Sequence, residues 1–229
     1  WLFRMTASFR VSDTSSFKRK LLEWAQGFDE VVWFDSNGHR DRYYSFDAFL
    51  AIDALTSFRT DFHNAFDALN EYQSLTKDWI FGYLTYDLKN DVERLSSKHT
   101  DRLKFPEIYF FQPKKIIRIK GDEVRFDYLN VVAEEIQSDY KILLSKCSDE
   151  FKEEYNNQSV KIKLGIFKDE YFRQVKTMLA HIQRGDVYEA NFCQEFYAEN
   201  TRIDALKTYR KLNKVSRAPF ATFLKLHDK

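Results

Sequence analysis

Residues 108–129 read IYFFQPKKIIRIKGDEVRFDYL, and this stretch decides the fold class. β-branched and aromatic residues dominate it, and such residues favour strands. The Gly121-Asp122 pair between two of the apolar runs is the signal of a tight hairpin. We therefore predict short antiparallel strands over Ile108–Phe111, Lys115–Lys120 and Glu123–Leu129.

The sequence upstream of this stretch extends the same pattern. Apolar and polar residues alternate from Phe3 to Val11, which is the period of a strand with one face exposed to solvent. The run Trp79–Leu88 is apolar or aromatic at nearly every position, as expected for a strand covered on both faces. Gly82 within that run predicts a bulge or a close approach of a neighbouring backbone.

Downstream, helical and strand patterns follow each other once more. Tyr171–Arg184 has the apolar period of a helix that ends at Gly185, and residues 188–198 alternate like a strand. Further elements are predicted as strands over 31–34, 43–52 and 220–226 and as helices over 61–75, 131–146 and 203–214. Strands dominate and do not alternate regularly with helices. The fold class predicted is α+β with largely antiparallel sheets.

The composition excludes several classes of protein. The 229 residues include 36 basic and 35 acidic side chains, whereas a dedicated nucleic-acid binder carries a basic excess. Cys147 and Cys193 form no CxxC pair, which argues against a disulfide framework or a four-thiolate zinc site and fits a reducing compartment. No apolar run is long enough for a membrane span. We expect a cytoplasmic protein that binds neither nucleic acid nor membrane.

The residues by themselves point to no catalytic centre. No glycine-rich phosphate loop and no HExxH spacing is present, and the five histidines are scattered. Cys193 has no predictable base beside it, so a packed thiol is favoured over a nucleophile. We assign no catalytic residue and no metal ligand. The most loop-like stretch, Asn156-Asn157-Gln158-Ser159, suggests a division into regions 1–155 and 156–229.

Four segments resemble one family of chorismate-utilising enzymes, which includes component I of aminodeoxychorismate synthase and of anthranilate synthase. The most specific are Asp78–Asn90, which reads DWIFGYLTYDLKN, and Gly185–Phe192, which reads GDVYEANF. Weaker matches are Phe105-Pro106 together with Phe111-Gln112-Pro113, and Ala218-Pro219-Phe220. The run Tyr86–Asn90 favours the aminodeoxychorismate branch, which leads to 4-aminobenzoate and folate, over the anthranilate branch.

The resemblance implies two antiparallel sheets packed face to face, with helices outside. It also implies replacement of a chorismate hydroxyl by ammonia, with Mg²⁺ holding the substrate and a glutamine amidotransferase subunit supplying the ammonia. Family members are roughly twice as long as this chain, and their catalytic and metal-binding residues lie in the C-terminal half. We therefore expect residues 156–229 to be the truncated start of the chorismate-binding region, and residues 1–229 alone to be inactive.

The resemblance also implies an effector pocket for a tryptophan-like amino acid, lined by Asp35, Ser36, Pro219 and Phe220. Asp35 stands where relatives have glutamate, and Ser216-Arg217 replace Asn-Pro. Arg217 could pair with a ligand carboxylate or obstruct the pocket, and a plain strand end with a packed aromatic residue is the other interpretation. Two alternatives to an aminating enzyme stay open: a non-catalytic amino-acid-binding module, and a domain that docks the amidotransferase.

Overall fold

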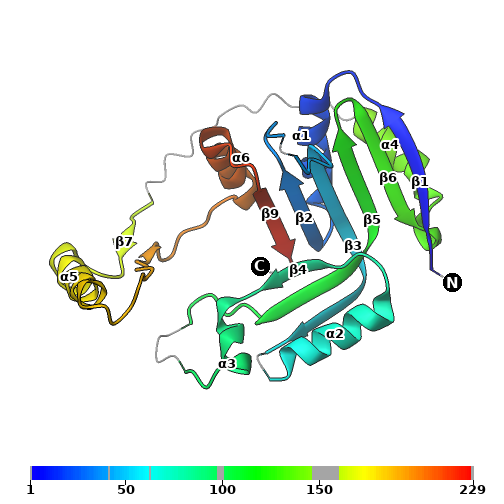
Figure 1. Ribbon diagram of the computed structural model, residues 1–229. Helices are drawn as coiled ribbons and strands as arrows, with labels where there is room; N and C mark the ends of the chain where they lie inside the picture. The colour runs from blue at the N-terminus through cyan, green and yellow to red at the C-terminus, as the bar shows by residue number, and fades with distance from the viewer. Residues whose placement is uncertain (1, 41, 62, 97–100, 146–159, 228–229) are drawn as a thin grey trace. The chain divides into compact units, whose positions relative to one another are not determined.

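The computed structural model describes residues 2–40, 42–61, 63–96, 101–145 and 160–227 (Figure 1). By spatial contacts the chain divides into two compact units, one formed by Trp1–Glu150 with Tyr209–Lys229 and the other by Phe151–Thr208. The last strand belongs to the first unit because it pairs with that unit's sheet. The division into regions 1–155 and 156–229 stays a prediction, and residues 156–159 lie outside the described part of the chain.

The first unit is built on a seven-stranded sheet with the order β1-β6-β5-β3-β2-β9, in which β4 also pairs with β5. Every pairing is antiparallel. The strands are β1 (Arg4–Arg10), β2 (Glu30–Asp35), β3 (Ala48–Thr60), β4 (Phe81–Leu84), β5 (Ile108–Lys120), β6 (Glu123–Leu129) and β9 (Ala221–Leu226). The predicted α+β class with antiparallel sheets is confirmed.

The hairpin predicted from the sequence forms β5 and β6, which lie between β1 and β3 in this sheet. Gly121 has φ 60°, and Lys120 pairs with Glu123 across the turn. The two strands predicted over 108–111 and 115–120 are one continuous strand, so that prediction is wrong in detail. Pro113 is accommodated because the β3–β5 register shifts between Ala54 and Thr56, and a proline without an N–H is tolerated at such an irregularity.

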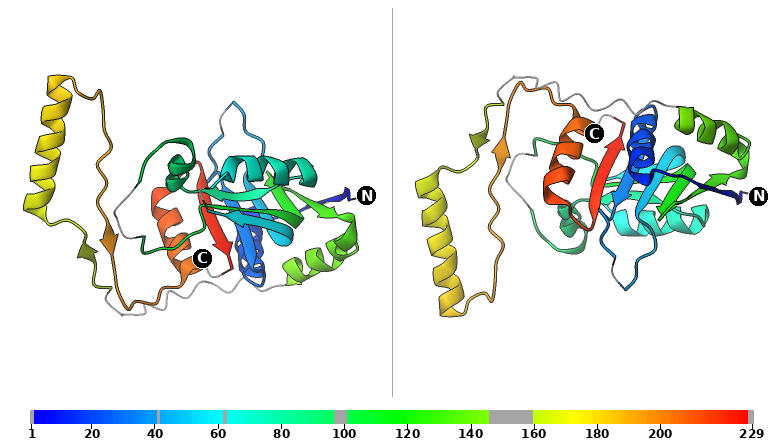
Figure 2. Two further views of the ribbon diagram at one scale, coloured as in Figure 1. Left: turned by 90° about the horizontal axis from the view of Figure 1, so that it is seen from below. Right: turned by 90° about the horizontal axis from the view of Figure 1, so that it is seen from above.

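Two helices, α1 (Thr14–Ala25) and α4 (Glu135–Ser145), pack against each other and against the sheet (Figure 2). The Asp13 side chain accepts a hydrogen bond from the Ser16 N–H and so caps α1. Phe9 of β1 stacks on Tyr140 of α4 at a ring distance of 3.9 Å. A third helix, α2 (Ala65–Thr76), lies along the distal part of β3. Burial of their apolar stripes holds these helices in place.

The segment 79–88 departs from its prediction. Only Phe81–Leu84 is a strand, and a 3₁₀ turn, η1 (Tyr86–Leu88), and a short helix, α3 (Lys89–Val92), follow it. Trp79 is 53% exposed and Tyr86 84% exposed, so the run is not covered on both faces. The reason is that β4 pairs only with β5, at the margin of the sheet.

The second unit contains α5 (Lys168–Arg184) and a two-stranded sheet of β7 (Lys163–Leu164) and β8 (Phe196–Tyr197). Gly185 caps α5 with φ 87°, as predicted. The strand predicted over 188–198 is wrong except at Phe196–Tyr197, because β7 offers a partner for two residues only. Packing of two sheets face to face stays a prediction.

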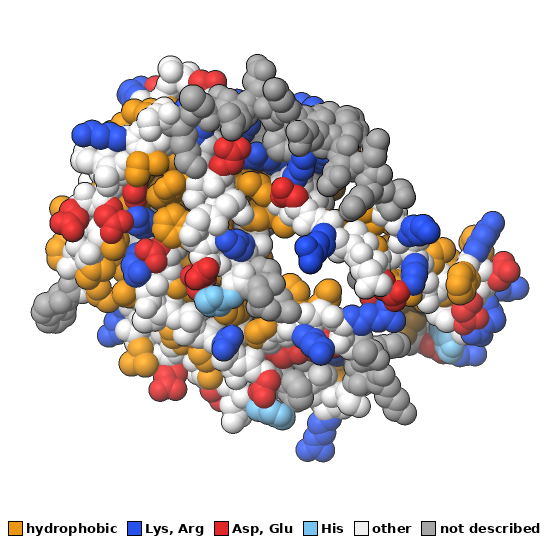
Figure 3. All heavy atoms as spheres, turned by 180° about the vertical axis from the view of Figure 1, so that it is seen from behind, with side chains coloured by type: hydrophobic (Ala, Val, Ile, Leu, Met, Phe, Trp, Pro, Cys, Tyr) orange, Lys and Arg blue, Asp and Glu red, His pale blue; other side chains and the backbone are white. Residues whose placement is uncertain are grey.

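The last helix, α6 (Ala205–Ser216), leads into β9. None of the helices in the described ranges is both long enough and apolar enough to cross a bilayer. Figure 3 shows one face of the molecule, where acidic and basic side chains are interspersed and hydrophobic ones reach the surface between them.

Candidate functional site

The pairing of β2 with β9 brings together the two segments predicted to form an effector pocket. Asp35 pairs with Ala221 and Phe34 with Thr222. Continuing this antiparallel register by one step sets Ser36 opposite Phe220. Residues near the two ends of the chain thus become neighbours through one strand pair.

A network of amide hydrogen bonds fixes the backbone beside this pairing. Asn37 and Gly38 have φ values of 50° and 79°, which form the tight turn after β2. The side-chain nitrogen of Asn37, Nδ2, donates hydrogen bonds to Asn213 Oδ1 at 2.8 Å and to the Ala218 carbonyl at 2.7 Å. Asn213 Nδ2 in turn donates to Asn37 Oδ1 at 3.0 Å. The turn is therefore held to the segment that carries Pro219 and Phe220.

Asp35 already has partners on the α1 side of the sheet. Its Oδ1 atom lies 2.9 Å from Lys18 Nζ and accepts a hydrogen bond from the Asn37 N–H at 2.9 Å. The negative charge of Asp35 also acts on the nearby Tyr209 hydroxyl. Burial first, and then the Asp35 carboxylate, raise the pKa of Tyr209 to about 12. The structure thus places Asp35 in an ion pair that ties α1 to β2.

Ser36 is the residue of this group that has unused hydrogen-bonding capacity. Its Oγ atom is buried and has no hydrogen-bond partner among the described residues. A buried polar atom without a partner is costly and calls for an explanation, such as a ligand or water. Pro219 is exposed and the Phe220 ring is 84% exposed. The strand pairing brings the segments together but leaves the aromatic ring facing solvent.

Arg217 precedes this segment in a left-handed conformation, with φ 44°. The Arg217 N–H donates a hydrogen bond to the Asn213 carbonyl, and the Arg217 carbonyl lies 3.0 Å from His39 Nε2. These backbone bonds end α6 and direct the chain into β9. The Arg217 residue is exposed.

The second segment that resembles the family, residues 185–192, lies in the second unit. Asp186 contacts Arg184 and His181 at the end of α5, and the Arg184 guanidinium, followed by His181, lowers the pKa of this carboxyl. Tyr188 is 94% exposed. Within the described ranges, no group of three or more His, Cys, Asp or Glu side chains could hold a metal ion. The described residues therefore do not form the Mg²⁺ site that the family resemblance implies.

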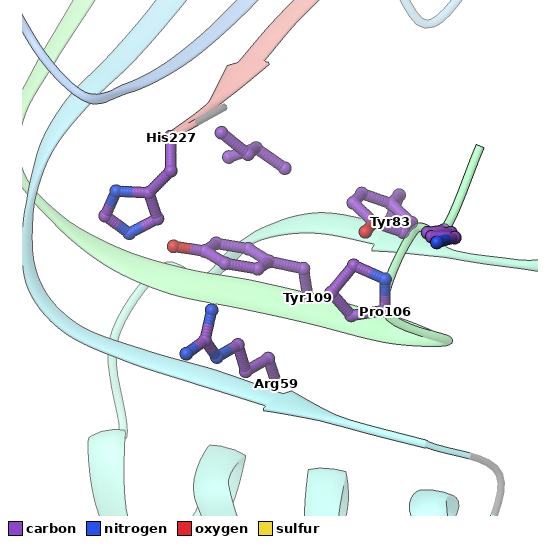
Figure 4. Close-up of a pocket in the computed structure, with 7 residues that line it drawn as sticks. Arg59, Tyr83, Pro106, Tyr109 and His227 are labelled. Carbon is purple, nitrogen blue, oxygen red and sulfur yellow. The ribbon is translucent and has the colours of Figure 1, made fainter. Parts of the chain in front are cut away.

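A cavity of about 190 Å³ lies at the opposite end of the β2–β9 pair, and the sequence reasoning missed it (Figure 4). Its walls are Tyr83, Pro106, Tyr109 and Leu226. Three basic residues, Arg59, Lys104 and His227, complete its lining. Tyr83 and Pro106 lie in segments that resemble the family, but no sequence pattern links the four separate segments that line the cavity.

The chain is similar to one family model and, over shorter stretches, to individual proteins. A family model described as chorismate binding enzyme matches residues 29–229. An anthranilate synthase component I-like protein of Synechocystis sp. is 24% identical over 148 residues, which cover 63% of this chain and 30% of that protein. Component 1 of aminodeoxychorismate synthase from Salmonella typhimurium is 42% identical over 59 residues, which cover 26% of this chain and 12% of that protein.

Among solved structures, the menaquinone-specific isochorismate synthase of Escherichia coli aligns with 98% of this chain and 50% of its own, with a TM-score of 0.45 and 11% identity. The matches thus span half or less of the length of these relatives. Because the family model covers most of the chain, from residue 29 to residue 229, the chain belongs to the chorismate-binding enzyme family.

Proposed function

We propose that this chain is the N-terminal part of component I of an aminodeoxychorismate synthase. The full-length protein replaces a hydroxyl of chorismate by an amino group and yields 4-amino-4-deoxychorismate, for synthesis of 4-aminobenzoate and folate. The observation that carries this proposal is family membership combined with local similarity to one branch. Component 1 of aminodeoxychorismate synthase from two bacteria is 34% and 42% identical over 61 and 59 residues.

The cofactor and the partner are part of the same proposal. Chorismate carries two carboxylates, so a metal ion that neutralises charge, here Mg²⁺, favours its reaction. In line with the family resemblance, we propose that the ligands of that ion come from the part of the full-length protein that lies outside residues 1–229. A glutamine amidotransferase subunit would supply ammonia, and the reaction would take place in the cytoplasm.

The test is a chorismate turnover assay with the full-length protein. With Mg²⁺ and ammonium at alkaline pH, it should consume chorismate without a partner subunit, because free ammonia replaces the amidotransferase. Glutamine should support the reaction only after the amidotransferase is added. The product should be converted to 4-aminobenzoate by a lyase, which is detected by chromatography.

Residues 1–229 serve as the control in the same assay and should show no turnover. Turnover by this chain alone would overturn the assignment of the reacting groups to the rest of the protein. Anthranilate as the main fluorescent product would move the protein to the anthranilate synthase branch, which the similarity to the Synechocystis protein keeps as the alternative.

A second candidate function, amino-acid binding at the β2–β9 pairing, is favoured by the buried, unpartnered Ser36 hydroxyl. If tryptophan binds there, it should raise the melting temperature of the full-length protein. At a concentration 100-fold above Kd the stabilisation is about 2.7 kcal/mol. Ser36→Ala should reduce the shift, whereas Ser8→Ala, at an exposed serine of β1, should leave it unchanged. No shift at millimolar tryptophan would leave only the structural role of this pairing.

A further inference from the structure

The cavity beside the end of β9 combines apolar walls with hydrogen-bond donors. Figure 4 shows the Tyr109 hydroxyl pointing between the His227 imidazole and the Arg59 guanidinium. The Tyr83 and Tyr109 rings stack with centroids 6.4 Å apart, and Pro106 and Leu226 add further apolar surface. With about 190 Å³, the cavity is smaller than the roughly 300 Å³ at which typical ligand sites begin. Its size suits a small molecule.

The two tyrosine hydroxyls differ in their hydrogen bonding. Tyr109 donates to Glu30 Oε1 at 3.4 Å, and the same oxygen lies 3.1 Å from His227 Nε2. The Tyr83 hydroxyl is buried without a partner in the described chain. Burial first, and then the negative charge of Glu107, raise the pKa of Tyr83 to about 12. The hydroxyl therefore keeps its proton at neutral pH and can donate a hydrogen bond. Tyr83 therefore offers one buried, unused donor.

The charges around the cavity favour a negatively charged ligand. Arg59 and Lys104 line it, and no ion pair joins either side chain to a carboxylate of the described chain. Of the two acidic neighbours, Glu30 accepts a hydrogen bond from Tyr109 and pairs with His227, and Glu107 accepts one from the Thr85 hydroxyl, which is neutral and does not compensate its charge. Among the described residues, neither carboxylate forms an ion pair with Arg59 or Lys104. A guanidinium, an ammonium and a phenol are all donors, and a carboxylate accepts hydrogen bonds from each of them.

We propose that this cavity is a binding site for a small carboxylate with a flat, apolar body. The carboxylate would bind at Arg59 and Lys104 and accept a hydrogen bond from Tyr83. The flat body would lie against the aromatic and aliphatic wall that Tyr109, Pro106 and Leu226 provide. The site is separate from the β2–β9 site at Ser36, because Glu30 and Asp35 mark opposite ends of β2. It does not depend on the function proposed above.

Benzoate is the probe, and benzamide is its uncharged match of the same shape. Isothermal titration of the purified protein should show saturable binding of benzoate, with benzamide weaker by at least about tenfold, because charge-assisted hydrogen bonds are lost. Arg59→Gln and Lys104→Gln should each weaken benzoate binding by about tenfold. Lys214→Gln makes the same change of charge at an exposed position of α6 and should leave binding unchanged.

Tyr83→Phe distinguishes a ligand site from a structural role of the same residue. It should weaken benzoate binding several-fold while leaving the melting temperature of the free protein unchanged or higher, because the lost hydroxyl had no partner. The proposal is overturned if benzoate and benzamide bind alike, if neither binds saturably, or if the Arg59, Lys104 and Tyr83 variants bind benzoate as the parent does. Each of these results is independent of chorismate turnover.

Discussion

At the scale of single residues, Gly82 shows how closely β4 approaches β5. A Cβ atom built at this position would lie 1.8 Å from the Tyr109 carbonyl oxygen and 2.7 Å from Phe110 Cα. Both contacts are with backbone, which cannot move aside as a flexible side chain can.

We expect Gly82→Ala to destabilise the protein by about 3 kcal/mol or more in urea unfolding, because β4 must separate from β5. Gly27→Ala is the control, since its nearest contact is 3.5 Å away, and it should change stability by less than about 1 kcal/mol. Equal effects of the two substitutions would contradict this account.

At the scale of elements, Lys115 joins β5 to α4. Its Nζ atom lies 2.6 Å from Asp139 and 2.6 Å from Glu135, and its side chain is 4% exposed. Burial alone would lower the pKa of Lys115, but the hydrogen bonds to Asp139 and Glu135 outweigh it and the pKa is raised. A raised lysine pKa means that this stabilisation is complete at neutral pH and is lost only as the pH rises beyond the ordinary value of 10.5.

Lys115→Met should therefore destabilise the protein by about 3–5 kcal/mol at pH 7, because it leaves the Asp139 carboxylate buried without a cation. The double variant Lys115→Met with Asp139→Leu should recover part of that lost stability, because two apolar side chains leave no buried charge without a partner. Lys141→Met, at an exposed position of α4, should lower the free energy of unfolding by less than about 0.5 kcal/mol. Chemical denaturation at pH 7 measures all three, and a Lys115→Met variant as stable as Lys141→Met would refute the role of this ion pair.

At the scale of the whole molecule, the described chain exposes many large apolar side chains (Figure 3). Tyr188 is 94% exposed, Phe220 84% and Phe196 65%. Apolar surface of this kind favours association. In sedimentation equilibrium, residues 1–229 should show an average mass that rises above 27.5 kDa with concentration. Phe220→Ser and Tyr188→Ser should lower that mass. A single species of 27.5 kDa at every concentration, melting cooperatively, would contradict the prediction.

The sequence by itself determined what depends on neighbouring residues. Gly121-Asp122 predicted the hairpin because a tight turn needs residues that accept its backbone angles, and Gly185 predicted the end of α5 for the same reason. The close approach at Gly82 was also foreseen, since glycine inside a strand leaves room for another backbone. The residue patterns around 78–90 and 185–192 indicated the family that the family model then matched.

Only the tertiary structure decided what depends on long-range pairing. It set β9 beside β2, so that Asp35 pairs with Ala221, and it ended β4 at Leu84 because no second strand pairs with it. It also brought Arg59, Tyr83 and Lys104 around one cavity with His227. Strand partners and cavities arise from contacts between residues far apart in the chain. Alternation of apolar residues shows which residues can face a core, but it carries no information about which strand will lie alongside.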